Sequence, residues 1–205
     1  MKKRTYKSNL RDSAANATRA RILKAAHDVL ANRRVAFSLG SVAKRAGVTR
    51  LTIYNQFKTK QGLLDAVFDD MAARGGLDQL KTVFATPDPK AALKSFVSIF
   101  CGFWATHRTL MPRFMAALAD PDVAENLRER RERKRSGLTV LVGRLMPQAD
   151  TQVARELVDV LHALTNSEFF QMLAIPDRSS ADVERLIQDQ VEAALAHSGG
   201  PPRLS

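Results

Sequence analysis

Residues 39–46 and 50–57 each carry apolar side chains at helical spacing, and only three residues separate the two segments. A helix-turn-helix requires a small residue before the turn, a glycine in it and an apolar residue after it. The end of the first segment and the link supply them in this order: Ala46, Gly47 and Val48. Glycine adopts a left-handed backbone conformation without steric cost, which suits it to a tight turn. Ser38 and Thr49 directly precede the two segments and are suited to cap their N-termini. The sequence therefore predicts a helix-turn-helix within residues 38–60.

Helical spacing of apolar residues continues through the rest of the chain. Residues 18–31 and 60–73 flank the motif with such patterns, and further helical segments extend to about residue 197. No segment combines strict apolar–polar alternation with β-branched enrichment, as a strand would. We therefore predict an all-α fold, in which an N-terminal three-helix bundle with the helix-turn-helix precedes a larger C-terminal helical domain. Residues 1–17 are polar and basic without apolar periodicity, so we expect a flexible basic arm there.

Positive charge is concentrated in the first third of the chain. The 205 residues include 32 Lys and Arg and 21 Asp and Glu, which gives a net charge of +11. Residues 1–60 hold 15 of these cations and only two acids, Asp12 and Asp28, a net charge of +13. The remainder holds 17 cations and 19 acids, a net charge of −2. This asymmetry predicts an electropositive module that binds a polyanion, joined to a module with a different task.

Several residues of the motif lie at the spacing of a known family: Gly47, Val48, Tyr54, Phe57 and Lys60. Through them, residues 18–71 resemble the TetR family of transcriptional repressors. That family has an Ala-x-x-Ala-Gly-Val-Ser/Thr turn, followed by a helix that ends in Leu/Ile-Tyr-x-His/Tyr-Phe. This chain departs from the pattern at Gln56, where His or Tyr is usual. It also has Leu39 and Gly40 where the family often has polar residues, and these two cannot make the corresponding side-chain bonds.

The resemblance implies that residues 50–57 form the helix that enters the major groove of a double-stranded DNA operator. Its outer face would read base edges through four side chains: Arg50, Leu51, Asn55 and Gln56. A second set would contact DNA phosphates: Ser38, Thr49, Thr52, Tyr54 and Lys60. The alternative is structural, because a Gly-Val turn also occurs in helical proteins that do not bind DNA, and Tyr54 can be a core residue.

The resemblance also divides the chain by task. It implies a DNA-binding domain at residues 18–60 and a helical ligand-binding and dimerisation domain at residues 61–200. A homodimer would form through two amphipathic helices of each subunit, at about residues 150–174 and 180–197. The alternative is that both helices pack only on the core of their own subunit.

Aromatic and methionine side chains are densest in the middle of the chain and recur near residue 170. Such groups can line an adaptable apolar cavity. We therefore predict a pocket for an apolar or aromatic small-molecule effector, lined by Phe100, Phe103, Trp104, His107, Met111, Phe114, Met115, Phe169 and Phe170. The alternative for each of them is a place in the hydrophobic core.

Other functions lack a signal in the sequence. Cys101 is the only cysteine and the four histidines are scattered, so we expect no metal and no cofactor. We find no Gly-rich phosphate loop and no nucleophile–base arrangement, and we predict that the chain is not an enzyme. The N-terminus lacks the apolar core of a signal peptide, and the longest uncharged apolar stretch, residues 95–107, is too short to span a bilayer. These observations predict a cytoplasmic protein with no membrane partner.

Together, these patterns favour a DNA-binding transcriptional regulator, a repressor that a small ligand releases from a palindromic operator. Two alternatives belong to other classes. One is a constitutive DNA-binding or architectural protein without a ligand. The other is an all-α enzyme whose basic first third binds an anionic substrate.

Overall fold

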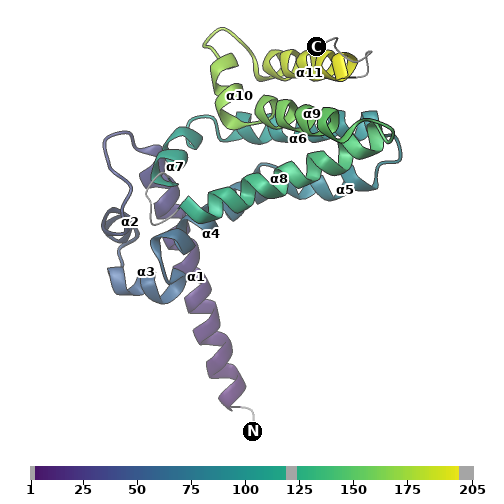
Figure 1. The fold of residues 1–205 in the computed structure, drawn as a ribbon. Coiled ribbons are helices and arrows are strands. Elements are labelled where there is room, and N and C mark those ends of the chain that lie inside the picture. The colour runs from purple at the N-terminus through teal and green to yellow at the C-terminus, as the bar shows by residue number, and fades with distance from the viewer. Residues whose placement is uncertain (1–2, 119–123, 199–205) are drawn as a thin grey trace. The chain divides into compact units, whose positions relative to one another are not determined.

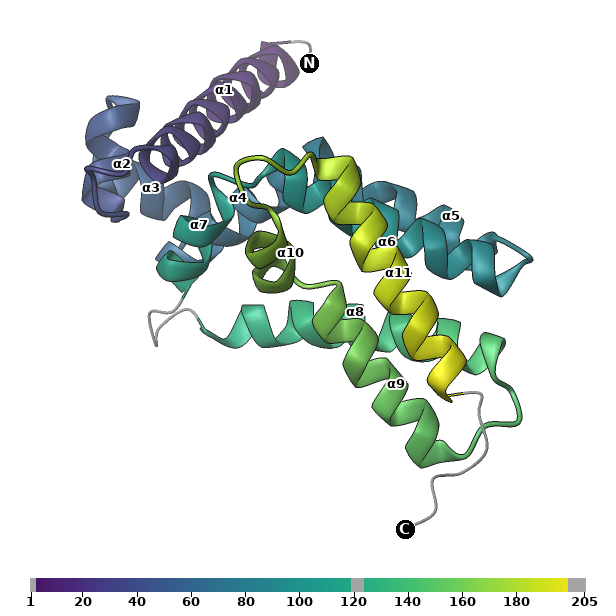
Figure 2. The same cartoon turned by 90° about the horizontal axis from the view of Figure 1, so that it is seen from above.

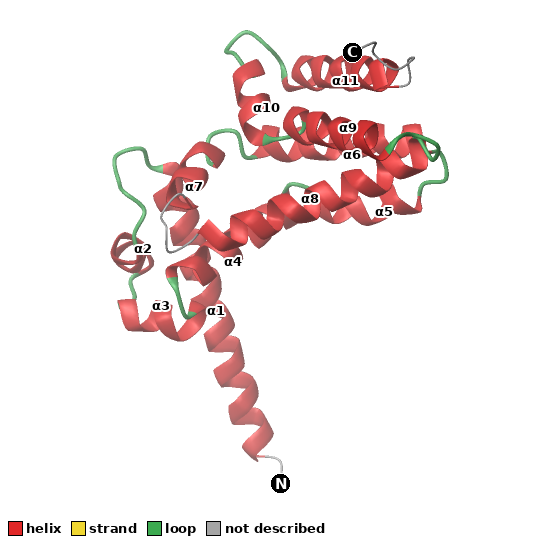
Figure 3. Ribbon diagram, viewed as in Figure 1, coloured by secondary structure: helices red, strands yellow, loops and turns green. Residues whose placement is uncertain are grey.

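The computed structural model describes residues 3–118 and 124–198, and it has no strand within these ranges (Figure 3). Its elements are α1 (Lys3–Ala31), α2 (Leu39–Ala46), α3 (Arg50–Phe57), α4 (Lys60–Arg74), the 3₁₀ turn η1 (Leu77–Gln79), α5 (Leu80–Ala85), α6 (Pro89–Thr106), α7 (Met111–Leu118), α8 (Ala124–Leu145), α9 (Thr151–Leu164), α10 (Ser167–Leu173) and α11 (Ser180–Ser198). The predicted all-α fold is therefore confirmed. None of the described helices is both long and apolar enough to cross a membrane.

The chain divides into two compact units. Unit 1 comprises Met1–Asp70 and Thr109–Ala124, and unit 2 comprises Met71–Arg108 and Glu125–Ser205. The helix α4 is continuous across the boundary and contributes residues to both units. The functional boundaries that we place after residues 17, 60 and 200 stay predictions.

Unit 1 is built on one face of α1. This face is buried along the second half of the helix: Ile22, Ala25, Ala26, Val29 and Leu30. The helices α2 and α3 lie beside this half of α1 (Figure 1), and α7 also contacts α1. A ring contact at 5.9 Å between centroids joins Phe114 of α7 to Phe68 of α4. The helix-turn-helix is thus held by a small core that includes a segment distant in sequence.

The first helix begins much earlier than the sequence predicts. We expected a flexible arm over residues 1–17, but α1 begins at Lys3. The segment holds neither glycine nor proline and is rich in alanine, so nothing in it terminates a helix. Its lack of apolar periodicity has a different meaning, because the described residues 13–17 are all exposed. At residues 13–17, the pattern therefore reflects solvent exposure and not the absence of a helix.

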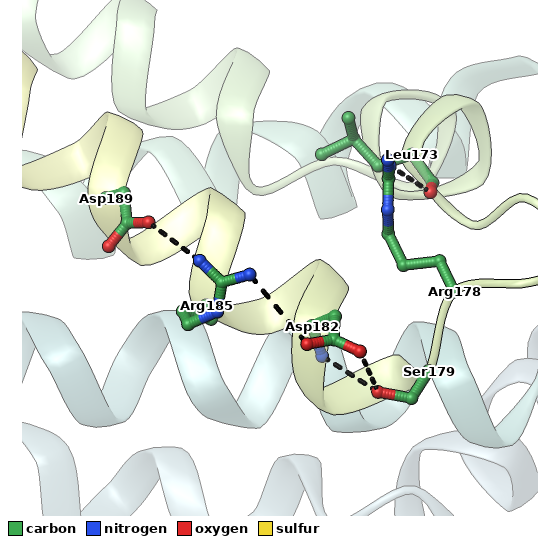
Figure 4. Close-up of polar contacts among 6 residues, drawn as sticks. All are labelled: Leu173, Arg178, Ser179, Asp182, Arg185 and Asp189. Carbon is green, nitrogen blue, oxygen red and sulfur yellow. Dashed lines mark hydrogen bonds and ion pairs between the residues drawn. The ribbon is translucent and has the colours of Figure 1, made fainter.

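Unit 2 is organised around α6, whose buried face includes Phe96, Phe100, Phe103 and Trp104. The helix α11 packs on both α6 and α9 (Figure 2). Its first turn is capped by Ser179, whose hydroxyl accepts a hydrogen bond from the Asp182 backbone N–H at 3.1 Å (Figure 4). The apolar residues of α9 and α11 that are buried within the subunit are Leu157, Val158, Leu161, Val183, Ile187 and Val191.

The helix predicted at about residues 150–174 is two helices, which corrects that prediction. The helix α9 ends at Leu164, and α10 begins at Ser167 after Asn166. The Asn166 side chain accepts hydrogen bonds from the backbone N–H groups of Glu168 at 3.0 Å and Phe169 at 3.4 Å. Asparagine favours such caps over helix interiors because its side chain competes for backbone donors. The apolar periodicity of the segment continued through this break and concealed it.

The cap at Asn166 gives a measurable stability difference. Asn166→Ala leaves two N–H groups of α10 without their acceptor, so we expect a loss of about 1 kcal/mol in unfolding free energy. Asn166→Asp retains the acceptor and should lose far less. Chemical denaturation of both variants at one protein concentration tests this. Equal stabilities of the alanine and aspartate variants would contradict the capping role.

Candidate nucleic-acid interface

The first helix of the motif is fixed at both ends by local hydrogen bonds. At its N-terminus, Ser38 and Ser41 exchange two bonds, because each hydroxyl accepts from the backbone N–H of the other residue at 3.0 Å. At its C-terminus, Gly47 has φ 63° and ψ 40° and donates its N–H to carbonyls of the last turn. This is the left-handed conformation that glycine adopts most readily. The predicted N-cap and the predicted glycine turn are both confirmed.

The second helix of the motif separates a buried side from an exposed side. Ile53 and Phe57 are buried, with 0% and 5% exposure. Thr49 caps the helix by accepting from the Thr52 backbone N–H at 3.1 Å. The four predicted base-reading residues lie on the remaining surface, where Arg50, Leu51 and Asn55 are exposed and Gln56 is partly exposed. Leu51 is 67% exposed, which leaves its apolar side chain available for contact.

Arg50 lies against the first helix of the motif. A Cβ added to Gly40 would come within 2.5 Å of Arg50 Nη2, so the guanidinium occupies the space that a side chain at residue 40 would take. We described Gly40 as a departure from the family pattern that loses a bond. The structure shows a second consequence, which is room for the Arg50 side chain. Nothing in the local sequence pattern could indicate this contact between helices.

Two further residues hold α3 in place, and sequence reasoning missed both. Arg19 of α1 donates to the Gln56 carbonyl at 3.1 Å, and its guanidinium lies 4.3 Å from the centre of the Phe57 ring. Gly62 of α4 allows a close approach, because a Cβ there would lie 2.2 Å from the Phe57 carbonyl oxygen. The sequence gives no signal of the Arg19 role, because its partners Gln56 and Phe57 are distant along the chain.

The predicted phosphate-binding residues differ in how far their groups are already engaged. Ser38 and Thr49 cap helices, and the Thr49 hydroxyl lies 2.9 Å from the Thr52 hydroxyl. Tyr54 is 48% exposed. Lys60 is the first residue of α4 and is partly buried. The set therefore lies along the motif from the start of α2 to the start of α4.

One acidic group of this region, Asp28, is engaged by cations of α1 and α2. Asp28 pairs with Arg45 at 3.0 Å and with Lys24 at 3.3 Å. Burial raises the pKa of Asp28, but hydrogen bonds and ion pairs with these two cations outweigh it and lower the pKa below its ordinary value. The carboxylate therefore remains charged and occupied by Arg45 and Lys24. The exposed guanidinium of Arg50 adds positive charge to the outer side of α3.

The predicted pocket residues are divided between the two units. Four of these residues lie on α6 and the turn after it, in unit 2, and their rings contact one another. The distance between ring centroids is 6.0 Å for Phe100 and Trp104, 4.7 Å for Phe103 and Trp104, and 5.0 Å for Phe103 and His107. Phe169 and Phe170 also belong to unit 2, and Phe170 is buried. The remaining three belong to unit 1: Met111, Phe114 and Met115.

Within the first group, polar atoms are engaged by the backbone. His107 is 7% exposed, and its Nε2 lies 2.9 Å from the Met71 carbonyl oxygen. Trp104 donates its indole N–H to the Thr165 carbonyl at 3.0 Å. Close ring contacts and high burial agree with the alternative of a hydrophobic core. Ligand binding by any of these residues stays a prediction.

Comparison with known proteins gives one family. Residues 22–67 match the family described as bacterial regulatory proteins, tetR family. A search of curated protein sequences found no significant relative. The match covers α2 and α3 and the buried parts of α1 and α4 that hold them.

Solved structures resemble the whole chain at low sequence identity. A transcriptional regulator from Rhodococcus sp. Rha1 is 22% identical with a TM-score of 0.65, over 90% of this chain and 99% of the other. A transcriptional regulator from Aquifex aeolicus VF5 is 14% identical with a TM-score of 0.61, over 86% and 98%. A TetR-like regulator from Rhodococcus sp. RHA1 is 18% identical with a TM-score of 0.61, over 87% and 96%. At these low sequence identities, the similarity shows a shared fold.

The family match and the fold match both agree with the geometry of the helix-turn-helix. The family match lies on the capped helix-turn-helix with its left-handed glycine, and the fold match extends over both units. Residues 22–67 of this chain therefore match the tetR family of bacterial regulatory proteins, and the chain shares its all-helical fold with solved structures of TetR-like transcriptional regulators.

Proposed function

We propose that this protein is a homodimeric repressor of transcription that binds a palindromic DNA operator and is released by a small-molecule effector. The observation that carries the proposal is the face of α3. Arg50 and Asn55 are exposed there, while Ile53 and Phe57 hold the same helix to its core. A short helix with a rigid inner side and exposed Arg and Asn is suited to read guanine and adenine in a major groove.

Charge supports DNA as the partner. Residues 1–60 carry a net charge of +13, and the duplex backbone is a dense polyanion. Tyr54 and Lys60 would bond phosphates on either side of the groove that α3 enters. A phosphate at Lys60 would also be attracted by the positive end of the α4 dipole, which lies at the N-terminus of that helix. Ser38, Thr49 and Thr52 would add contacts to phosphates through those hydroxyl protons and lone pairs that helix capping does not use.

The proposed dimer uses the outer faces of α9 and α11. Several apolar residues of these helices remain partly or largely exposed in the subunit: Val153, Val160, Leu164, Leu186 and Leu195. On α11, Arg185 lies between Asp182 at 3.8 Å and Asp189 at 3.4 Å (Figure 4). These charges compensate one another within the helix, so they can lie at the rim of an interface. A dimer would set two α3 helices against successive major grooves.

Effector release requires a path from unit 2 to the helix-turn-helix. The helix α4 is the direct covalent candidate, because it begins at the proposed phosphate ligand Lys60 and ends inside unit 2. An effector that binds one conformation more tightly would shift the population away from the DNA-binding state.

The proposal is tested with the purified full-length chain. We expect a dimer by light scattering, and selection from a random duplex pool should enrich palindromes with half-sites one helical turn, or about 34–36 Å, apart. A pool that remains unenriched at low and moderate salt would overturn the DNA-binding proposal. A monomer that selects one half-site would overturn only the dimer.

A protein that binds DNA without any effector is the second candidate. The close ring contacts of Phe100, Phe103 and Trp104 favour it, since they agree with a filled core. A screen of metabolites for compounds that release the selected duplex separates the two candidates. Failure of every compound to release DNA or to stabilise the chain against heat would support constitutive binding.

A further inference from the structure

A lysine side chain enters the aromatic cluster of unit 2 at the break between α9 and α10. Lys134 of α8 donates to the His162 carbonyl at 3.3 Å and to the Thr165 carbonyl at 3.2 Å. Its ammonium nitrogen lies 5.3 Å from the centre of the Phe100 ring. The Thr165 carbonyl also accepts the Trp104 indole N–H at 3.0 Å. One carbonyl thus joins the lysine to the tryptophan.

The Lys134 charge has no anionic partner at ion-pair distance among the described residues. Its two acceptors are neutral carbonyls at long distances, and an ammonium group has a third proton to donate. The carboxylate whose charge acts on Lys134 is that of Glu168, which makes no ion pair with it and accepts a hydrogen bond from the Ser167 hydroxyl at 2.9 Å. The carboxylate of Asp159 is paired with Arg135. A partly buried cation is costly when only neutral groups compensate it.

A second polar atom beside Lys134 is also left over. His162 Nε2 is buried and has no hydrogen-bond partner within the described part of the chain. Burial lowers the pKa of His162, and the charges of Lys134 and Arg135 lower it further. The ammonium group of Lys134 is therefore short of an acceptor, and the cations Arg131 and Arg135 lie beside the same junction. A hydrogen-bonded anion would satisfy this arrangement.

We propose that Lys134 binds the carboxylate of a small aromatic acid, whose ring contacts Phe100 and Trp104. This inference rests on the proposed effector-dependent function and gives the effector a chemical class. The carboxylate supplies the missing charge for Lys134, and the aromatic faces supply apolar contact. Because Thr165 lies between α9 and α10, the bound acid also competes for the donors that fix this junction.

The protonation state of Lys134 should make the affinity for the acid depend on pH. Burial lowers the pKa of Lys134 to about 7, Glu168 opposes this shift, and Arg131 adds to it. An anion favours the charged lysine, so carboxylate affinity should be highest below pH 7 and should fall as the lysine loses its proton. We expect a decrease on the order of tenfold between pH 6.5 and pH 8. Burial and the charges of Lys134 and Arg135 lower the pKa of His162, which favours its neutral form in this range.

The test uses the only tryptophan of the chain as its reporter, since Trp104 shares an acceptor with Lys134. Fluorescence titrations at pH 6.5 compare benzoate, phenylacetate and 3-phenylpropionate with their primary amides. We expect at least one acid to bind saturably, and its amide to bind at least about tenfold more weakly. If no acid binds, or if an acid and its amide bind equally, the proposal is overturned.

Variants separate a binding role from a structural one. Lys134→Met keeps an apolar chain over Phe100 and should lose at least about tenfold in acid affinity, with amide binding unchanged. Lys134→Arg should retain acid binding. Arg133→Met removes an exposed charge from the same helix and should match the wild type. Full acid affinity in Lys134→Met would overturn the assignment, and the pH profile of the wild type decides the question if that variant does not fold. No titration contains DNA, so this inference can fail while operator binding holds.

Discussion

Arg50→Ala is expected to cost a homodimer between about 30-fold and 10⁴-fold in affinity for its selected palindrome. The reason is that one good base contact contributes about 1–3 kcal/mol and the substitution removes it from both half-sites. Binding to unrelated duplexes should change far less, because nonspecific affinity depends mainly on total charge. Competition binding with selected and scrambled duplexes measures both quantities. Arg133→Ala, which removes an exposed charge from α8, is the matched control.

The contact between Arg50 and Gly40 sharpens this test. Gly40→Ala places a Cβ where the Arg50 guanidinium lies, at 2.5 Å from Nη2. The far end of a flexible side chain can move at low cost, and alanine favours a helix by about 0.5–1 kcal/mol over glycine. We therefore expect Gly40→Ala to unfold at an unchanged or higher temperature and yet to lose part of its preference for the selected duplex. If Gly40→Ala kept full specificity while Arg50→Ala lost it, the position of Arg50 against α2 would have no part in reading DNA.

The helix-turn-helix is predictable from sequence because its signals are local. Ser38 and Thr49 cap the helices that directly follow them, and Gly47 adopts the backbone angles that its position requires. Apolar spacing likewise identifies Ile53 and Phe57 as buried. Each of these inferences depends on residues within one helical turn of one another, so the chain order already contains the geometry.

The features that sequence reasoning missed depend on contacts between distant segments or on solvent. Arg50 meets Gly40 across two helices, and Arg19 reaches Gln56 from α1. The predicted pocket mixed residues of both units, because proximity in sequence places Met111 near Trp104 although α7 joins unit 1. Apolar periodicity also describes only the buried face of a helix. It therefore missed the helix at the exposed residues 13–17 of α1 and continued through the break at Asn166.

Gly75→Ala is expected to destabilise unit 2 by about 1–3 kcal/mol, although it adds only a methyl group. A Cβ at residue 75 would lie 2.4 Å from Phe103 Cδ2 and 3.1 Å from the Met71 carbonyl oxygen. The Phe103 ring cannot easily move away. It is fully buried, and its centroid lies 4.7 Å from Trp104 and 5.0 Å from His107. Thermal and denaturant unfolding at fixed protein concentration measure the loss.

Gly102→Ala is the matched control and should have the opposite sign. Residue 102 precedes Phe103 in α6, is exposed, and has nothing within 4 Å of an added Cβ. Alanine in this helix interior should stabilise the protein by about 0.5–1 kcal/mol, because glycine loses more backbone entropy on folding. Phe103→Leu combined with Gly75→Ala should recover part of the Gly75→Ala loss, since a smaller side chain makes room for the methyl group. Simple additivity of these two substitutions would show that residue 75 and Phe103 do not compete for the same space, and that the cost of Gly75→Ala arises instead at His107 Nε2 and the Met71 carbonyl oxygen, each 3.1 Å from the added Cβ.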